Sequence, residues 1–250
     1  MSAAPHLVLL PGLDGTGELF APLLQALGED VPTTVVRYGA ELTFDEYVES
    51  AGKALPEQCV LIAESFSGPV AIAVAARHPG KIRRLVLCAT FAVSPFRTLL
   101  RGTRFVPKRM FRPSLLLPTM VDHFCFSGAS VPVRPSPVAV VSTVPPAIMR
   151  ARLACLGKID VRPLLPRIAT PTLYLRASTD RIVSSRLSRE LTSQLPNVTV
   201  ADINGPHLLL QTRPRECAAA ITTFFRADSD QPCTRPVTGG GSGSPSSTDR

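Results

Sequence analysis

Short apolar runs alternate with longer amphipathic stretches along most of the 250-residue chain. Runs that are apolar throughout are typical of strands covered on both faces, and amphipathic stretches between them indicate helices that connect parallel strands. The pattern therefore predicts an α/β fold in which helices flank a mostly parallel sheet. The predicted strands are 6–10, 33–38, 59–64, 84–89, 172–177 and 199–203. The predicted helices are 18–27, 44–55, 68–77, 185–194 and 208–225.

The alternation stops between about residues 91 and 158, where prolines are scattered and strands no longer follow helices. A long insertion within a compact domain is usually functional, and we expect it to form a lid over a pocket. Beyond Phe225 the chain becomes rich in polar residues and glycine, and it has little apolar surface to bury. The expected organisation is an α/β core at 1–90 and 159–226, a lid insertion at 91–158 and a disordered tail at 227–250.

Hydrophobic residues make up 45% of the chain, which is enough for one domain with a substantial core. None of the apolar runs approaches the roughly 20 residues that a membrane-spanning helix needs. The first residues, 1–6, lack the basic and apolar regions of a secretory signal peptide. The sequence therefore predicts a cytoplasmic protein without a membrane span.

The net charge of +8 is concentrated in the insertion, which holds ten Lys or Arg residues and a single acid, Asp122. Clustered positive charge favours an anionic partner such as an acyl carrier, but a solvated basic surface explains it as well. Nucleic-acid binding would need a basic surface with interleaved aromatic side chains, and the sequence has no such pattern.

Six cysteines are widely separated, and several lie inside apolar runs, as Cys59 and Cys88 do. Cysteine packs as a small hydrophobic residue, so buried free thiols are expected. The sequence has neither a CxxC pair nor an HExxH motif. We therefore expect neither a metal ion nor another cofactor.

Ser65 lies between a predicted strand and a predicted helix. Small residues, Ala63 and Ser67, stand two positions before and after it, as in the nucleophile elbow that exposes a serine hydroxyl on a sharp turn. Small residues are needed there because the turn brings the strand and the helix close together. Ser65 could instead cap the helix that begins near Gly68, so the local segment leaves both interpretations open.

A nucleophilic serine requires a histidine base, which a carboxylate orients in turn. After a nucleophile elbow, the acid and then the histidine follow on loops at the carboxyl ends of later strands. Asp180 follows the predicted strand 172–177, and His207 follows the predicted strand 199–203. Either residue alone could cap a turn or a helix. Their joint order predicts Ser65 as nucleophile, Asp180 as acid and His207 as base.

Acyl transfer also needs two N–H donors for the negative charge on the oxygen of the tetrahedral intermediate. The glycine-rich segment 9–17 follows the first predicted strand, and its Leu13 N–H is one expected donor. The Phe66 N–H, directly after Ser65, is the other. A phosphate loop is the alternative, but the segment lacks the Gly-Lys-Ser/Thr ending and the GxGxxG spacing.

The segments LPGLDGTG and IAESFSG, together with the Asp180 loop and the Gly205-Pro206-His207 loop, resemble the α/β-hydrolase family over about residues 5–225. The first two segments are most similar to small carboxylesterases of the pimeloyl-acyl-carrier-protein methyl ester esterase type. The resemblance implies the α/β-hydrolase fold with a shortened sheet of about six strands, all parallel. It also implies a small-molecule ester or thioester substrate, since the family's dehalogenases and epoxide hydrolases have aspartate where Ser65 stands.

Two other functions fit the same motifs. Acyl transfer to an alcohol would use the same triad with water excluded, and a non-catalytic ligand-binding protein could keep the fold without turnover. The set of Ser65, Asp180 and His207 favours a carboxylic ester hydrolase that forms an acyl-enzyme intermediate and needs no cofactor.

Overall fold

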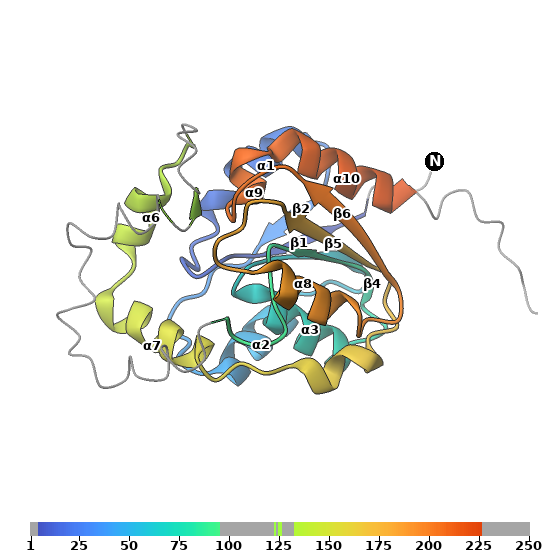
Figure 1. Ribbon diagram of the computed structural model, residues 1–250, viewed down its shortest axis with the longest axis horizontal. Helices are drawn as coiled ribbons and strands as arrows, with labels where there is room; N and C mark the ends of the chain where they lie inside the picture. Colours follow the sequence, from blue (N-terminus) through green and yellow to red (C-terminus); the bar gives the residue numbers. More distant parts are fainter. Residues whose placement is uncertain (1–4, 96–122, 124, 127–132, 227–250) are drawn as a thin grey trace, which may run out of the picture.

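The computed structural model describes residues 5–95, 123, 125–126 and 133–226. A six-stranded sheet lies at its centre, in the order β2-β1-β3-β4-β5-β6, and every neighbouring pair of strands is parallel (Figure 1). The predicted shortened parallel sheet is therefore confirmed. The strands are β1 (Leu7–Leu10), β2 (Thr33–Val35), β3 (Cys59–Glu64), β4 (Ile82–Cys88), β5 (Thr172–Ala177) and β6 (Val198–Ile203).

Strands β1 and β3 are buried along their full length. Successive side chains of a strand point to opposite faces of the sheet. In β1, Val8 and Leu10 belong to one core cluster, and Leu7 and Leu9 belong to the other. Because each face is covered, both sets must be apolar, and this explains the uninterrupted apolar runs in the sequence.

Helices cover both faces of the sheet (Figure 1). One core cluster includes side chains from α2, α3 and α8, and the other includes side chains from α1, α9 and α10. These helices are α1 (Ala21–Leu27), α2 (Phe44–Lys53), α3 (Ser67–Arg77), α8 (Ser185–Thr192), α9 (Leu209–Thr212) and α10 (Pro214–Arg226). Two 3-10 helices, η1 (Glu18–Phe20) and η5 (Arg162–Arg167), complete the core.

The prediction of one continuous helix over 208–225 is wrong, because the helix is interrupted at Arg213. Pro214 has no N–H to donate, and its ring disfavours helical backbone at the preceding residue. Arg213 accordingly adopts φ −132° and ψ 48°. The outcome is the short α9, directly after the His207 loop, followed by α10.

The second strand is also shorter than predicted, since it ends at Val35 rather than at Tyr38. Beyond β2 the chain still donates hydrogen bonds toward the loop after β1. The Tyr38 N–H donates to the Gly15 carbonyl over 2.8 Å. The segment after β2 therefore lies against the glycine-rich loop.

Both ends of the predicted insertion meet at one place on the core. Val93 forms an isolated antiparallel bridge with Asp160, and the Val161 N–H donates to the Ala92 carbonyl over 2.8 Å. Within the insertion, α6 (Pro137–Thr143) and α7 (Pro146–Leu156) lie to one side of the sheet and its covering helices (Figure 1). The division into core and lid stays a prediction, and most of 96–132 and the predicted tail at 227–250 lie outside the described residues.

In the described part of the chain, no single helix is long and apolar enough to cross a membrane. Helices α6 and α7 reach such a length and composition only as a pair, and a bend of 104° separates them.

Candidate active site

Ser65 lies on the sharp turn between β3 and α3. Its φ of 49° places a non-glycine residue in the left-handed region, a strained backbone conformation that is concentrated at functional sites. The Ser65 N–H donates to the Cys88 carbonyl over 3.0 Å. The Ser65 carbonyl accepts from the Gly68 N–H at 3.1 Å and from the Thr90 hydroxyl at 2.5 Å. These hydrogen bonds hold the strained turn in place.

Close packing of this turn explains why small residues surround Ser65. A Cβ atom added at Gly68 would lie 2.0 Å from the Thr90 Oγ1, far inside van der Waals contact. The Ser67 side chain is fully buried and donates its hydroxyl to the Pro11 carbonyl, on the loop after β1. Ser67, one of the two small residues that flank Ser65, therefore adds a hydrogen bond between the elbow and the glycine-rich loop.

The three predicted triad residues lie within hydrogen-bonding distance of one another. The Ser65 Oγ is 2.8 Å from the His207 Nε2, and the His207 Nδ1 is 2.9 Å from the Asp180 Oδ2. The other carboxylate oxygen of Asp180 accepts the N–H groups of Ile182 and Val183, each at 2.8 Å. Both oxygens of Asp180 are thus engaged, and the carboxylate has a fixed orientation.

The sheet brings these side chains together from distant parts of the sequence. Ser65 follows β3, Asp180 follows β5 and His207 follows β6, so each lies beyond the carboxyl end of a parallel strand. The side chains of His207 and Asp180 are only 5% and 4% exposed. Because Asp180 can only accept a hydrogen bond, the His207 Nδ1 must donate, which leaves the Nε2 lone pair for the Ser65 hydroxyl.

The two expected oxyanion donors lie on two adjoining turns. A hydrogen bond of 3.1 Å from the Gly15 N–H to the Gly12 carbonyl closes the turn after β1, with Leu13 at its second position. Phe66 is the first residue before α3. Among the described residues, neither the Leu13 N–H nor the Phe66 N–H donates a hydrogen bond, as the expected oxyanion role requires.

Glu64 is a buried acid of the site that the sequence patterns do not identify. It ends β3, is 2% exposed, and its Oε2 accepts from the Gln211 Nε2 over 3.1 Å. Burial is the largest cause that raises the Glu64 pKa from 4.5 to about 7. The Gln211 hydrogen bond and His207 lower this pKa, and Asp14 raises it. A carboxyl group that titrates near neutral pH therefore lies directly beside the predicted nucleophile.

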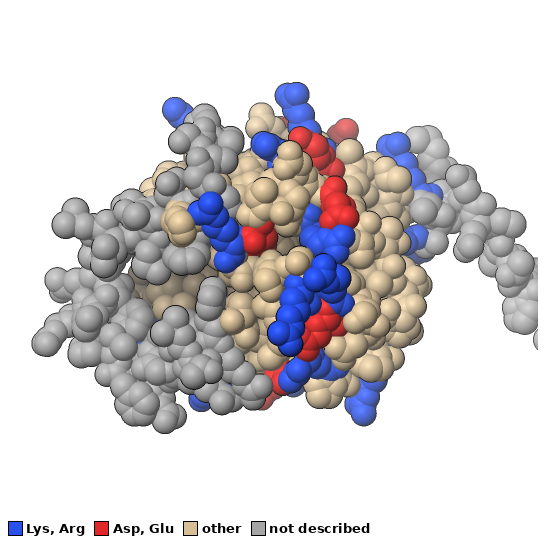
Figure 2. Space-filling model, viewed as in Figure 1, with Lys and Arg blue, Asp and Glu red and all other residues tan. Residues whose placement is uncertain are grey.

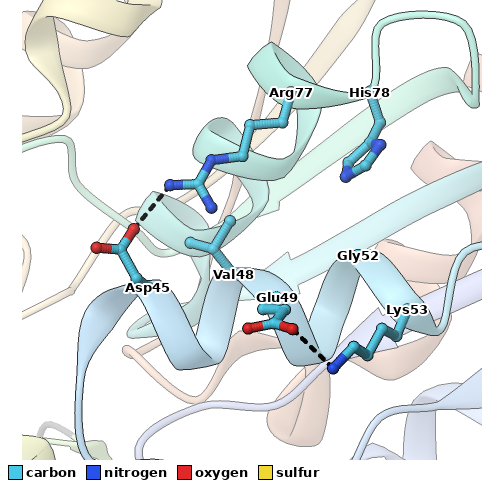
Figure 3. A pocket seen from close by; sticks show the side chains of 7 residues that line it. All are labelled: Asp45, Val48, Glu49, Gly52, Lys53, Arg77 and His78. Carbon is cyan, nitrogen blue, oxygen red and sulfur yellow. Dashed lines mark hydrogen bonds and ion pairs between the residues drawn. The ribbon is translucent and has the colours of Figure 1, made fainter.

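A separate hollow lies along α2 and the end of α3 (Figure 3). The Asp45–Arg77 and Glu49–Lys53 ion pairs, each 2.7 Å long, line it together with His78. Exposed ion pairs of this kind contribute little to stability and are common on protein surfaces. The hollow holds no nucleophile beside a base. Elsewhere in the described ranges, no cluster of His, Cys, Asp and Glu is suited to hold a metal ion.

The cysteines agree with the expectation of free thiols. All five described cysteines are unpaired, and four of them are buried. Burial raises the pKa of Cys59 and of Cys155 to about 11, so both are protonated at neutral pH. Cys233 lies outside the described residues.

Comparison with known proteins identifies the family. The model of the alpha/beta hydrolase family matches residues 7–220. Pyrrolizixenacetamide deacetylase of Xenorhabdus hominickii is 27% identical over 90% of this chain and 92% of its own length. Pimeloyl-[acyl-carrier protein] methyl ester esterase of Vibrio atlanticus is 28% identical over 77% of this chain and 83% of its own length.

Solved structures show the same fold. MenH from S. aureus superposes with a TM-score of 0.78 over 92% of this chain and 96% of its own, at 16% sequence identity. The enol-lactonase from Burkholderia xenovorans LB400 has a TM-score of 0.73 over 90% of this chain and 92% of its own, at 19% identity. The match of the family model over most of the sequence, with this fold, shows that the chain belongs to the alpha/beta hydrolase family.

Proposed function

We propose that this protein is a serine hydrolase that cleaves a carboxylic ester or thioester of a small molecule through an acyl-enzyme intermediate. Family membership supports hydrolase activity, and the names of the two relatives, a deacetylase and a methyl ester esterase, agree with that class. One observation carries the finer proposal: the hydrogen-bonded series from Ser65 through His207 to Asp180, with Ser65 on a strained turn.

In the first half of the reaction, the Ser65 Oγ attacks the carbonyl carbon while the His207 Nε2 takes the hydroxyl proton. The carbonyl π electrons move to the oxygen, which accepts hydrogen bonds from the N–H groups of Leu13 and Phe66. Collapse of this intermediate breaks the bond to the alcohol or thiol, which leaves with the proton from His207. Asp180 stabilises the imidazolium while it is charged.

In the second half, water attacks the acyl group on Ser65 while the His207 Nε2 takes a proton from the water. A second tetrahedral intermediate forms and collapses, the acid leaves, and the proton returns to the Ser65 Oγ. These steps use only groups of the protein and water.

The anionic acyl carrier stays one of two interpretations of the basic insertion. One of its ten basic residues, Arg152, is buried and so is withdrawn from any carrier. On the face in Figure 2, basic and acidic side chains of described residues are interleaved. Just after the insertion, the Arg162 guanidinium lies 2.6 Å from Asp160 and 3.0 Å from Glu190. These paired charges belong to the core, so both interpretations of the basic insertion stay open. The cytoplasmic location also stays a prediction.

Labelling with a fluorophosphonate probe and turnover of p-nitrophenyl and thioester substrates of varied chain length test the proposal. The probe should modify Ser65, and the Ser65→Ala variant should lose both labelling and turnover. Activity that survives this substitution, or a wild-type protein that the probe does not label, would contradict it; the second result would favour a non-catalytic ligand-binding protein. Formation of a new ester when an alcohol is added would indicate acyl transfer instead.

A further inference from the structure

Arg152 is a buried charge outside the set of Ser65, His207 and Asp180. It belongs to α7, inside the predicted insertion, yet it is only 2% exposed. None of the ion pairs between described residues involves it. A buried guanidinium is costly unless polar groups surround it, so its hydrogen-bond partners indicate its role.

Three of its four described partners are backbone carbonyls of two core loops. The Nη1 donates to the carbonyls of Leu13 at 3.1 Å and Asp14 at 2.5 Å. The Nη2 donates to the Tyr38 carbonyl at 3.1 Å, and the Nε donates to the Tyr47 hydroxyl at 3.4 Å. One side chain of the insertion thus connects the loop after β1 with the segment after β2 and with α2.

Arg152 acts on the direction of the Leu13 N–H through the two peptide planes that follow Leu13. Leu13 and Asp14 are the central residues of the turn that the Gly15 N–H closes onto the Gly12 carbonyl. Holding the two central carbonyls fixes the Leu13–Asp14 and Asp14–Gly15 peptide planes. The second plane carries the Gly15 N–H, whose hydrogen bond to the Gly12 carbonyl orients the Gly12–Leu13 plane and with it the Leu13 N–H. Gly15, with φ +69°, makes room for the guanidinium, because a Cβ there would lie 2.5 Å from the Arg152 Nη1.

The same partners extend to the second expected oxyanion donor. The Tyr47 ring packs edge-on against the rings of Phe66 and Tyr38, with centroids 5.1 Å and 4.9 Å apart. The Tyr38 hydroxyl lies 2.9 Å from the Ser67 Oγ, at the start of α3. A continuous series of buried contacts therefore runs from Arg152 to both turns that carry the proposed donors.

We propose that Arg152 is a positioning residue that holds the Leu13–Asp14 turn in the orientation that binds the oxyanion. This inference rests on the proposed function. The oxyanion forms only when Ser65 attacks the carbonyl. Loss of Arg152, which orients a donor to this oxyanion, should therefore weaken binding of the transition state more than binding of the substrate.

Kinetics of Arg152→Ala and Arg152→Lys test this role. In Arg152→Ala, kcat should fall about 100-fold with KM within about threefold of wild type, because a misaligned oxyanion donor costs transition-state stabilisation. Arg152→Lys keeps the charge and should lose less. Guanidinium ion, added far below denaturing concentrations, should raise kcat of Arg152→Ala and leave wild type unchanged. Leu165→Ala, a fully buried core position in η5, is the control for a loss of stability alone and should keep kcat while folded.

Hydrogen exchange of the Gly15 and Thr16 backbone amides, which donate to the Gly12 carbonyl and the Asp14 carboxylate within this turn, supplies a readout that needs no turnover. These amides should exchange faster in both Arg152 variants than in wild type, while those of β3 stay protected. Unchanged exchange, or a loss of kcat that Leu165→Ala reproduces, would overturn the positioning role. If wild type has no hydrolase activity, the proposed function fails, and the exchange data alone decide whether Arg152 orders the turn.

Discussion

Replacement of Glu64 by glutamine should change how the stability of the protein depends on pH. Burial raises the Glu64 pKa from 4.5 to about 7, so the folded protein holds this proton more tightly than the unfolded chain does. Proton binding by Glu64 therefore stabilises the folded protein. This contribution is fully present below the unfolded pKa of 4.5, and it is lost as the pH rises through the folded pKa of about 7. Glu64→Gln removes the titrating group and keeps the shape of the side chain.

The magnitude follows from the difference between the two pKa values. A difference of about 2.5 units corresponds to about 3 kcal/mol in full, and about 2.5 kcal/mol of this falls between about pH 5 and about pH 8. The free energy of unfolding in urea, measured for both proteins at these two pH values, should show wild type losing that amount relative to Glu64→Gln. Glu49→Gln, at an exposed carboxyl of α2, is the control and should keep the wild-type dependence. Parallel pH profiles for wild type and Glu64→Gln would refute the reasoning.

Three further predictions concern the triad, the elbow and the thiols. Asp180→Asn should lower kcat for an active ester by roughly 10³-fold or more, because the amide can donate to the His207 Nδ1 and favour the wrong tautomer; near-wild-type kinetics would exclude this role for Asp180. Gly68→Ala should lower the free energy of unfolding by more than about 2 kcal/mol, because its Cβ would lie 2.0 Å from the Thr90 Oγ1; an unchanged melting temperature would argue against this packing. The thiol of Cys88 is buried and its pKa is raised, so iodoacetamide should modify it only after unfolding, and rapid labelling of the native protein would contradict its burial.

The sheet and the placement of the candidate site follow from the sequence for clear physical reasons. Strands β1 and β3 are buried on both faces, so their side chains must be apolar throughout and the runs are easy to recognise. Parallel strands bring their carboxyl ends to one edge, so residues that follow three different strands meet there. The motif order predicts that Ser65, Asp180 and His207 come together, and the hydrogen bonds are consistent with it. Their catalytic roles stay predictions.

Glu64 and Arg152 could not be identified in the same way. Glu64 follows an apolar run as a surface residue would, yet it is buried and accepts a hydrogen bond from Gln211 of α9, which is 147 positions away in the sequence. Arg152 stands 139 positions from Leu13 in the sequence, and no local periodicity links them. The break at Arg213 differs, because Pro214 is a local signal from which it was predictable.

Trapping of the acyl group is the most direct test of the account. Wild-type protein mixed with an activated ester and quenched in acid within the first turnover should carry the acyl mass on the peptide that contains Ser65. The modification should disappear as the substrate is consumed, because water releases the acid, and it should be absent from Ser65→Ala. Turnover with no acylated Ser65 peptide, or acylation of another residue that keeps pace with turnover, would contradict the central claim that Ser65 is the nucleophile.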